Sequence, residues 1–175
     1  MEDLATKRST FSLSERETTG FVLQRDQRSG EFLLAAQFLT PQFLNMEAMA
    51  RTCKQLWRST NGFKIRNHKG QRVLFVFDNL GDVDRILQNQ PWSLDKHLVM
   101  LQRYNSDVSV RELIFKTTLF WVQVHDIPVR YMNRRVAEEI CDIVGEVQKS
   151  VGAVDDDGGF FIRVRVLIDI SLPLC

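Results

Sequence analysis

The chain has 175 residues, of which 44% are hydrophobic and 26% charged, a composition typical of globular proteins that excludes a disordered chain. Its net charge of +1 gives no whole-chain reason to expect a polyanionic partner. Three widely spaced cysteines, an acidic N-terminus and the lack of a membrane-length apolar window predict a soluble intracellular protein, nuclear or cytoplasmic, with no disulfide framework and no membrane contact.

The first predicted elements are strands followed by a helix. Residues 1–19 are polar and predict a flexible arm, and Gly20–Gln24 is interpreted as a short strand. Phe32–Leu39 is a short apolar run stopped by Pro41, as expected of a buried strand. Asn45 favours an N-cap, and apolar residues recur after it at helical spacing: Met46, Met49, Ala50, Cys53, Leu56 and Trp57.

A hairpin and a second helix are predicted next. The strands Phe63–Arg66 and Arg72–Phe77 flank a glycine-containing turn, which is typical of a hairpin. Asp78 or Asn79 is expected to cap a short helix, and Pro91 prevents that helix from continuing.

A Pro91-Trp92 corner then leads into a strand over His97–Tyr104. The predicted order is therefore strand, helix, strand, strand, helix, strand within a first unit over residues 20–104. Two helices should cover one face of an antiparallel sheet, which is the α+β, two-layer order of an RNA-recognition-motif-like (RRM-like) unit.

Residues 105–116 are interpreted as a linker, and residues 117–175 as a second, partial unit packed on the first. Its predicted order is strand, helix, strand, strand, and each unit enters its first helix through a proline, an aromatic residue and an asparagine. This similarity predicts an internal repeat whose second copy lacks its last helix and strand. The predicted elements are a strand over Phe120–His125, a helix capped by Asn133, a weak strand over Val147–Val154, an acidic turn over 155–159 and a strong strand over Phe160–Ile170.

Two packing arrangements are expected from alternation and helical spacing. On the first sheet, Leu74 and Val76 point away from the helices, and we expect the second unit to cover them. On the helix of the second unit, one face carries the apolar residues Val136, Ile140, Ile143 and Val144.

Basic residues are concentrated in residues 48–77, which contain no Asp or Glu. Phosphate binding needs convergent cations, so this segment is our first candidate for nucleic-acid contact; the alternative that these are ordinary solvated faces remains open. Three candidates lie on one helix face and four on the hairpin: Arg51, Lys54, Arg58, Lys64, Arg66, Lys69 and Arg72.

A second candidate surface lies on the last strand, where Phe161, Arg163 and Arg165 share one face. An aromatic ring beside two arginines suits single-stranded nucleic acid, but the interpretation that we favour is an exposed strand face with protective charges. On the hairpin strand, the two positions where a recognition motif stacks bases are Arg72 and Leu74, so the usual aromatic platform is missing there.

Catalytic and metal chemistry is not expected. His68, His97 and His125 stand apart from Cys and from one another, and no Ser or Cys lies in a nucleophile pattern. We therefore expect no enzyme activity, no cofactor, no metal site and no small-molecule substrate.

Several motifs occur in an order that is typical of one family: Phe38-Leu39-Thr40, Leu74-Phe75-Val76-Phe77, Pro91-Trp92-Ser93, His97-Leu98-Val99, Trp121 to Pro128, and Arg163-Val164-Arg165-Val166. Over about residues 20–174 the chain resembles the plant domain-of-unknown-function family 4283 (DUF4283), found in Gag-like proteins of retroelements and their genomic derivatives. The zinc knuckle that often follows this domain is not in the sequence.

The resemblance implies a nucleic-acid-binding module tied to a retroelement RNA. Together with the basic residues, it predicts a non-catalytic domain that binds RNA or another single-stranded nucleic acid mainly through phosphates. The alternative is a protein-interaction or self-assembly module, and a homo-oligomer is compatible with either function.

Overall fold

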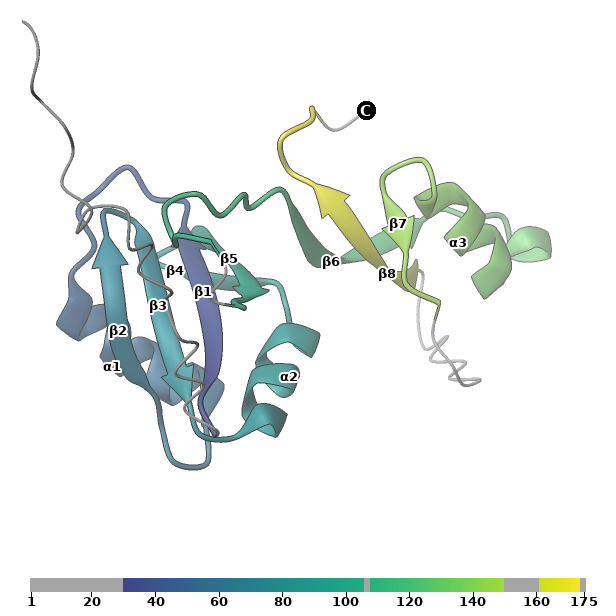
Figure 1. The fold of residues 1–175 in the computed structure, drawn as a ribbon. Coiled ribbons are helices and arrows are strands. Elements are labelled where there is room, and N and C mark those ends of the chain that lie inside the picture. The colour runs from purple at the N-terminus through teal and green to yellow at the C-terminus, as the bar shows by residue number, and fades with distance from the viewer. Residues whose placement is uncertain (1–29, 106–107, 150–160, 174–175) are drawn as a thin grey trace, which may run out of the picture.

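The computed structural model describes residues 30–105, 108–149 and 161–173 and places them in two antiparallel sheets with three α-helices (Figure 1). The α+β class is thereby confirmed. The expected arm over 1–19, the strand over 20–24 and the acidic turn over 155–159 lie outside the described residues. The elements are β1 (Phe32–Phe38), α1 (Met46–Trp57), β2 (Lys64–Lys69), β3 (Arg72–Phe77), α2 (Leu80–Gln88), β4 (Trp92–Leu94), β5 (His97–Arg103), β6 (Thr117–His125), a 3₁₀ turn η1 (Val129–Tyr131), α3 (Arg134–Cys141), β7 (Glu146–Val147) and β8 (Phe161–Asp169).

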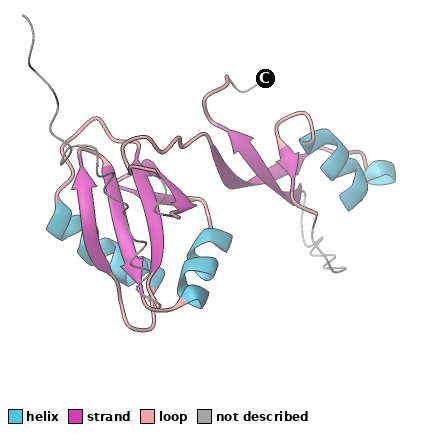
Figure 2. Ribbon diagram, in the orientation of Figure 1, coloured by secondary structure: helices cyan, strands magenta, loops and turns pink. Residues whose placement is uncertain are grey.

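The first sheet has the neighbour order β2-β3-β1-β5-β4, with every pair antiparallel (Figure 2). Helices α1 and α2 pack on the same face, because Trp57 and Ile86 belong to one core cluster with Leu34 and Phe75 of the sheet. Each helix begins at a predicted asparagine cap: Asn45 accepts from the Ala48 amide at 3.1 Å and Asn79 from the Gly81 amide at 2.8 Å.

An additional strand, β4, occupies the position where the sequence indicated only a corner. It forms a hairpin with β5 through Asp95 and Lys96, whose φ angles of 48° and 66° are both in the left-handed region. Two positive φ angles are what the tight hairpin turn compatible with strand twist requires. The usual Asn-Gly or Asp-Gly signal is absent, which is why the pattern did not predict this strand.

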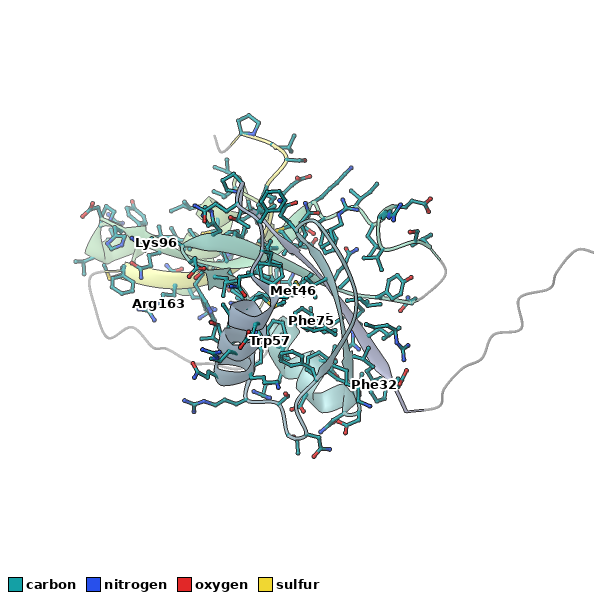
Figure 3. The ribbon with its side chains drawn as sticks, turned by 90° about the vertical axis from the view of Figure 1, so that its left-hand side faces the viewer. Phe32, Met46, Trp57, Phe75, Lys96 and Arg163 are labelled. Atoms are coloured by element: carbon teal, nitrogen blue, oxygen red, sulfur yellow. The ribbon has the colours of Figure 1, made fainter. Side chains whose placement is uncertain are left out.

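An aromatic cluster around Trp57 fills the core of the first unit (Figure 3). Trp57 meets Phe75 edge to face with ring centroids 4.9 Å apart, and its centroid lies 6.5 Å from that of Trp92. The Trp92 indole nitrogen donates to the Ile86 carbonyl at 2.8 Å. Trp92 thus closes the core next to the end of α2.

The second sheet has the order β6-β8-β7, with α3 packed on one face. The first unit has the same arrangement of its first three strands, since β2-β3-β1 corresponds to β7-β8-β6. This topological match supports the predicted internal repeat. Of the weak strand expected at Val147–Val154, only Val147 belongs to β7, and residues 150–154 are not described.

Helix α3 is oriented differently from the prediction. Ala137 and Cys141 are buried against the sheet and Val136 is partly buried, but Ile140, Ile143 and Val144 are exposed. The helix ends at Cys141, so Ile143 and Val144 do not continue its 3.6-residue period. The two small buried side chains also let the helix approach the sheet closely.

Gly145 connects α3 to β7 where the backbone passes β8 closely. A Cβ at this position would lie 2.4 Å from the Leu167 carbonyl oxygen, a distance that no real Cβ contact shows. We therefore expect Gly145→Ala to move β7 and destabilise the second unit by at least about 1 kcal/mol. Urea unfolding followed by circular dichroism measures this, with Gly81→Ala as a milder control, since its Cβ would approach only the Asn79 side chain at 3.2 Å. Equal stability of Gly145→Ala and wild type would contradict the close approach.

The linker covers part of the helix-free face of the first sheet. Leu74, 4% exposed, packs in a small cluster with Ala35 and with Val110, Leu113 and Phe115 of the linker. Leu74 and Val76 are both buried, as expected, but the residues that pack on Leu74 come from the linker and not from the second unit.

Gln90 and Arg165 connect the two units. The buried Gln90 side chain accepts from the Thr118 hydroxyl at 2.9 Å and donates to the Leu101 carbonyl at 3.3 Å. The Arg165 guanidinium donates to the Gln88 carbonyl at the C-terminus of α2. A cation at that end of a helix is favoured by the helix dipole.

Candidate nucleic-acid interface

The outer face of the second sheet, opposite α3, combines aromatic and basic side chains. Alternation along β6 and β8 places the even-numbered residues, which are mostly apolar, toward α3 and leaves odd-numbered residues pointing outward. Cross-strand pairing then builds three successive rungs on this outer face, which we call the aromatic–arginine face: Trp121 with Arg165, Gln123 with Arg163, and His125 with Phe161.

Side chains within the aromatic–arginine face contact one another. The His125 and Phe161 rings lie 5.1 Å apart, and the Arg163 guanidinium lies 5.3 Å from the Phe161 ring centroid. Trp121 is 55% exposed, which is unusual for so large an apolar side chain and leaves its ring accessible to a ligand. Arg163 is exposed as well, and Figure 3 labels it on this strand.

Arg165 was predicted as an exposed candidate for nucleic-acid contact, but the structure shows it buried and bonded to the first unit. It is 9% exposed, its guanidinium lies 5.0 Å from the Trp121 ring centroid, and it donates to the first unit. Burial lowers the pKa of this guanidinium below its ordinary value, because desolvation disfavours the charged form. Arg165 therefore lies against the Trp121 ring and connects the units, while Arg163 is the exposed cation of the face.

The predicted basic residues of α1 lie on its exposed side and at its C-terminal cap. Arg51, Lys54 and Arg58 are all exposed, and Arg51 also pairs with Glu47 one turn earlier at 3.0 Å. Such an exposed ion pair is weak and leaves the arginine free to exchange partners. We call these three residues the α1 basic face.

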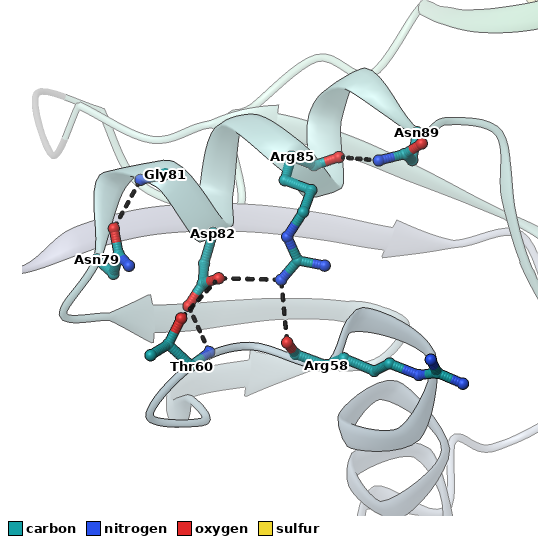
Figure 4. Close-up of polar contacts among 7 residues, drawn as sticks. All are labelled: Arg58, Thr60, Asn79, Gly81, Asp82, Arg85 and Asn89. Atoms are coloured by element: carbon teal, nitrogen blue, oxygen red, sulfur yellow. Dashed lines mark hydrogen bonds and ion pairs between the residues drawn. The ribbon is translucent and has the colours of Figure 1, made fainter.

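Arg58 ends α1 and also accepts a contact from α2 (Figure 4). Its carbonyl accepts from the Arg85 guanidinium at 3.1 Å, and Arg85 in turn pairs with the buried Asp82 at 2.9 Å. The Asp82 carboxylate also accepts from the Thr60 amide at 2.7 Å. Only the backbone of Arg58 takes part in this network, while its side chain points away from it.

The hairpin residues do not join the α1 basic face. Lys64 precedes Ile65, which packs on the helix side of the sheet, so alternation directs Lys64 toward the opposite face. The register between β2 and β3 shifts at Arg66, so alternation does not place the Arg66 side chain. Arg66 pairs with Glu31 at 2.7 Å. Lys69 lies at the end of β2, opposite Arg72.

Arg72 is committed to holding the linker. Its guanidinium donates to the carbonyls of Val110 and Arg111 and to the Gln37 side chain, and it lies 5.8 Å from the Phe115 ring centroid. The structure therefore keeps three of these basic residues on the α1 basic face, pairs Arg66 with Glu31 and uses Arg72 to hold the linker.

Trp121 and His125 are the residues of this interface that the sequence reasoning missed. The strand over Phe120–His125 was predicted, but only Phe161, Arg163 and Arg165 were singled out. The alternation Trp121, Gln123, His125 was a usable signal, because every second residue of a strand shares one face. The His125 ring nitrogen also lies within hydrogen-bond distance of the Gln123 side-chain oxygen, at 3.2 Å.

The part of the chain that the structure describes offers neither a cluster of metal ligands nor a membrane-spanning helix. No group of three or more His, Cys, Asp or Glu side chains there is arranged to hold a metal ion. None of its helices is long and apolar enough to cross a membrane.

Comparison with known proteins supports one assignment. The family model for DUF4283, a domain of unknown function, matches residues 28–112. This segment belongs to the DUF4283 family. No curated protein and no solved structure matches the chain. The matched DUF4283 segment contains the first sheet, both of its helices and much of the linker, and it is shorter than the resemblance over 20–174 that the motifs suggested. The α1 basic face lies inside the DUF4283 segment and the aromatic–arginine face outside it.

Proposed function

We propose that this protein is a non-catalytic binding module for single-stranded nucleic acid, with RNA as its natural partner. The observation that carries the proposal is the aromatic–arginine face, where exposed Trp121, the His125–Phe161 pair and exposed Arg163 lie on adjacent rungs of one sheet. Stacking on aromatic rings and cationic contacts to phosphates are the two devices by which proteins hold single strands. Resemblance to Gag-like proteins of plant retroelements implies the same partner.

The first unit is best related to an RRM-like sandwich. The neighbour order β2-β3-β1-β5 and the placement of both helices on one face support this relation. In a recognition motif, bases stack on the helix-free face of the first and third strands. In this chain that face carries Leu74 beneath the linker, which disfavours base stacking there.

The second unit leaves the corresponding face open. By the repeat, β6 corresponds to β1 and β8 to β3, so the aromatic–arginine face occupies the position of an RNA-reading surface. Trp121 and His125 are four residues apart, which is about 13 Å along an extended strand. That length suits roughly two or three stacked bases, with Arg163 between them to meet a phosphate.

The α1 basic face is proposed as a second, purely electrostatic contact. Arg51, Lys54 and Arg58 offer three exposed cations but no aromatic partner, so they would add affinity without sequence preference. Binding is therefore expected to be strongly salt-dependent and only modestly selective among sequences.

Filter-binding titrations at two salt concentrations test the proposal, with single-stranded RNA, single-stranded DNA and duplexes as probes. Trp121→Ala and Phe161→Ala are each expected to weaken single-strand binding about tenfold, since one stacked base contributes roughly 1–3 kcal/mol. Arg163→Gln should weaken binding and reduce the logarithmic salt slope by about 0.7, the value for one phosphate on a single strand. Neutralising the α1 basic face should reduce that slope by up to about 2.

Matched controls separate local effects from general ones. Phe43→Ala removes a fully exposed ring in the loop before α1, and Arg135→Gln removes an exposed cation on α3. Both should bind like wild type. Failure of the wild-type protein to bind any probe would refute the function, whereas wild-type binding by Trp121→Ala and Phe161→Ala would refute the aromatic–arginine face alone.

A further inference from the structure

Strand β6 lies at the edge of the second sheet. In the first unit the corresponding strand, β1, is paired on one side with β3 and on the other with β5. Strand β6 is paired with β8, and among the described residues no strand occupies its other edge. The edge of β1 that pairs with β5 in the first unit thus corresponds to an edge of β6 that has no partner strand among the described residues.

Backbone amides and carbonyls along this edge of β6 point away from β8, where a further strand could pair with them. The Leu119 amide points outward, because it donates to the Gln90 side chain at 3.4 Å rather than to β8. Alternation then directs the amides and carbonyls of Trp121, Gln123 and His125 to the same open edge. Strand β6 is nine residues long, keeps an unbroken register with β8 and contains no charged residue. Exposed edges are usually protected by charges, prolines or bulges, and this one has none.

The apolar side of β6 is incompletely covered. Leu34, Ala36 and Phe38 of β1 are at most 2% exposed, since neighbouring strands flank them on both sides. The corresponding residues of β6 pack on the second core but remain partly exposed: Phe120, Val122 and Val124. A neighbouring strand on the open edge would complete this layer.

We propose that the open edge of β6 pairs antiparallel with the same edge of a second copy of this chain, around a two-fold axis at Gln123. Gln90 occupies the edge at Leu119, so the longest symmetric register that avoids it runs from Trp121 to His125. Three outward-facing residues then exchange backbone hydrogen bonds with the second copy. The result is one continuous sheet in the order β7-β8-β6-β6-β8-β7.

The side chains of this register match one another, which favours a second copy over an unrelated strand. On the outer face, Trp121 lies opposite His125 of the second copy, and Gln123 lies opposite its own counterpart. On the side facing α3, Val122 lies opposite Val124. Aromatic, amide and β-branched side chains thus each meet a partner of their own kind, as stable cross-strand pairs do. The pairing also joins two aromatic–arginine faces into one surface, but it does not depend on nucleic acid.

Light scattering after size exclusion, with nuclease-treated full-length protein over a range of concentrations, tests the pairing. Wild type should pass from monomer to dimer as concentration rises. Gln123→Lys alone and Gln123→Glu alone should each stay monomeric. The two-fold axis places the two like-charged residues directly opposite each other, with their Cα atoms about 5.5 Å apart. An equimolar mixture of the two variants should recover the dimer.

The controls test whether the charge variants at Gln123 alter the fold as well as the pairing. Its side chain is exposed, so both charge variants should keep the circular-dichroism spectrum and unfolding midpoint of wild type. Gln55→Lys, on the exposed side of α1, should dimerise normally. A wild type that is monomeric at every concentration, a dimer that survives either single charge, or a mixture that stays monomeric would each overturn the proposal. None of these results bears on whether the aromatic–arginine face binds nucleic acid.

Discussion

Trp57→Ala is expected to destabilise the first unit by about 3–5 kcal/mol, the range found when a large buried aromatic side chain is truncated. Trp57 is 1% exposed and contacts four other aromatic rings, those of Phe63, Phe75, Phe77 and Trp92. Its removal loses apolar burial and leaves a cavity that α1 and the sheet cannot close without breaking edge-to-face contacts. Urea unfolding followed by circular dichroism gives the free energy.

Leu56 provides the matched control, because it precedes Trp57 in α1 and is 44% exposed. Leu56→Ala removes a large apolar side chain from the same helix without opening the core, and alanine is a good helix former. Its effect should stay within about 0.5 kcal/mol. Similar losses from the two substitutions would show that α1 contributes through helix propensity and not through the aromatic cluster.

Short-range signals predicted the fold well. All three asparagine caps act as expected, including Asn133, which accepts from the Val136 amide at 3.0 Å. Apolar alternation correctly divided β8 into a core side and an outer side. These features depend on residues a few positions apart, so the sequence contains nearly all the information they require.

Features that depend on distant or backbone-specific contacts were not predictable. Strand β4 depends on the positive φ angles of Asp95 and Lys96, which the sequence pattern did not predict because neither residue is glycine. Arg72 and Arg165 looked like exposed cations, but each meets backbone carbonyls 38 or more residues away in the chain. A basic residue that reaches a distant carbonyl cannot be distinguished by pattern from one that faces solvent.

The aromatic–arginine face illustrates the same limit at the candidate site. Its halves lie on two strands that were both predicted, yet the register that sets Trp121 beside Arg165 and His125 beside Phe161 joins residues more than 35 positions apart. A shift of one residue would have turned each side chain to the other face. The strands could therefore be predicted, and the surface they build together could not.

Asp82→Ala is expected to cost about 2–3 kcal/mol at neutral pH, because a buried carboxylate with charge-assisted hydrogen bonds would be lost. Asp82 is 4% exposed and holds the end of α1 to the start of α2 through Thr60 and Arg85. Burial by itself would raise the pKa of Asp82, but hydrogen bonds from Arg85 and Thr60 outweigh it and hold that pKa below its ordinary value. Urea unfolding of wild type and variant measures the loss.

The lowered pKa fixes the direction of the pH dependence. A carboxyl whose pKa is lower in the folded protein binds protons more readily when unfolded, so its stabilisation is present at neutral pH. It begins to be lost as pH falls below about 4, the ordinary Asp value, and is gone below the folded pKa. Asp82→Asn keeps the size of the side chain but cannot ionise, so its stability deficit relative to wild type should shrink over that acidic range.

Asp78→Asn supplies the control, since Asp78 is exposed and hydrogen-bonds only the Asn61 side chain among the described residues. Its effect should stay within about 0.5 kcal/mol at neutral pH. A deficit for Asp82→Asn that stays constant from neutral pH into acid would mean that the charge of Asp82 does not hold the two helices together. A deficit that shrinks on acidification for Asp82→Asn and not for Asp78→Asn would locate the electrostatic link between α1 and α2 at this one carboxylate, whose partner Arg85 also donates to the carbonyl of Arg58 in the α1 basic face.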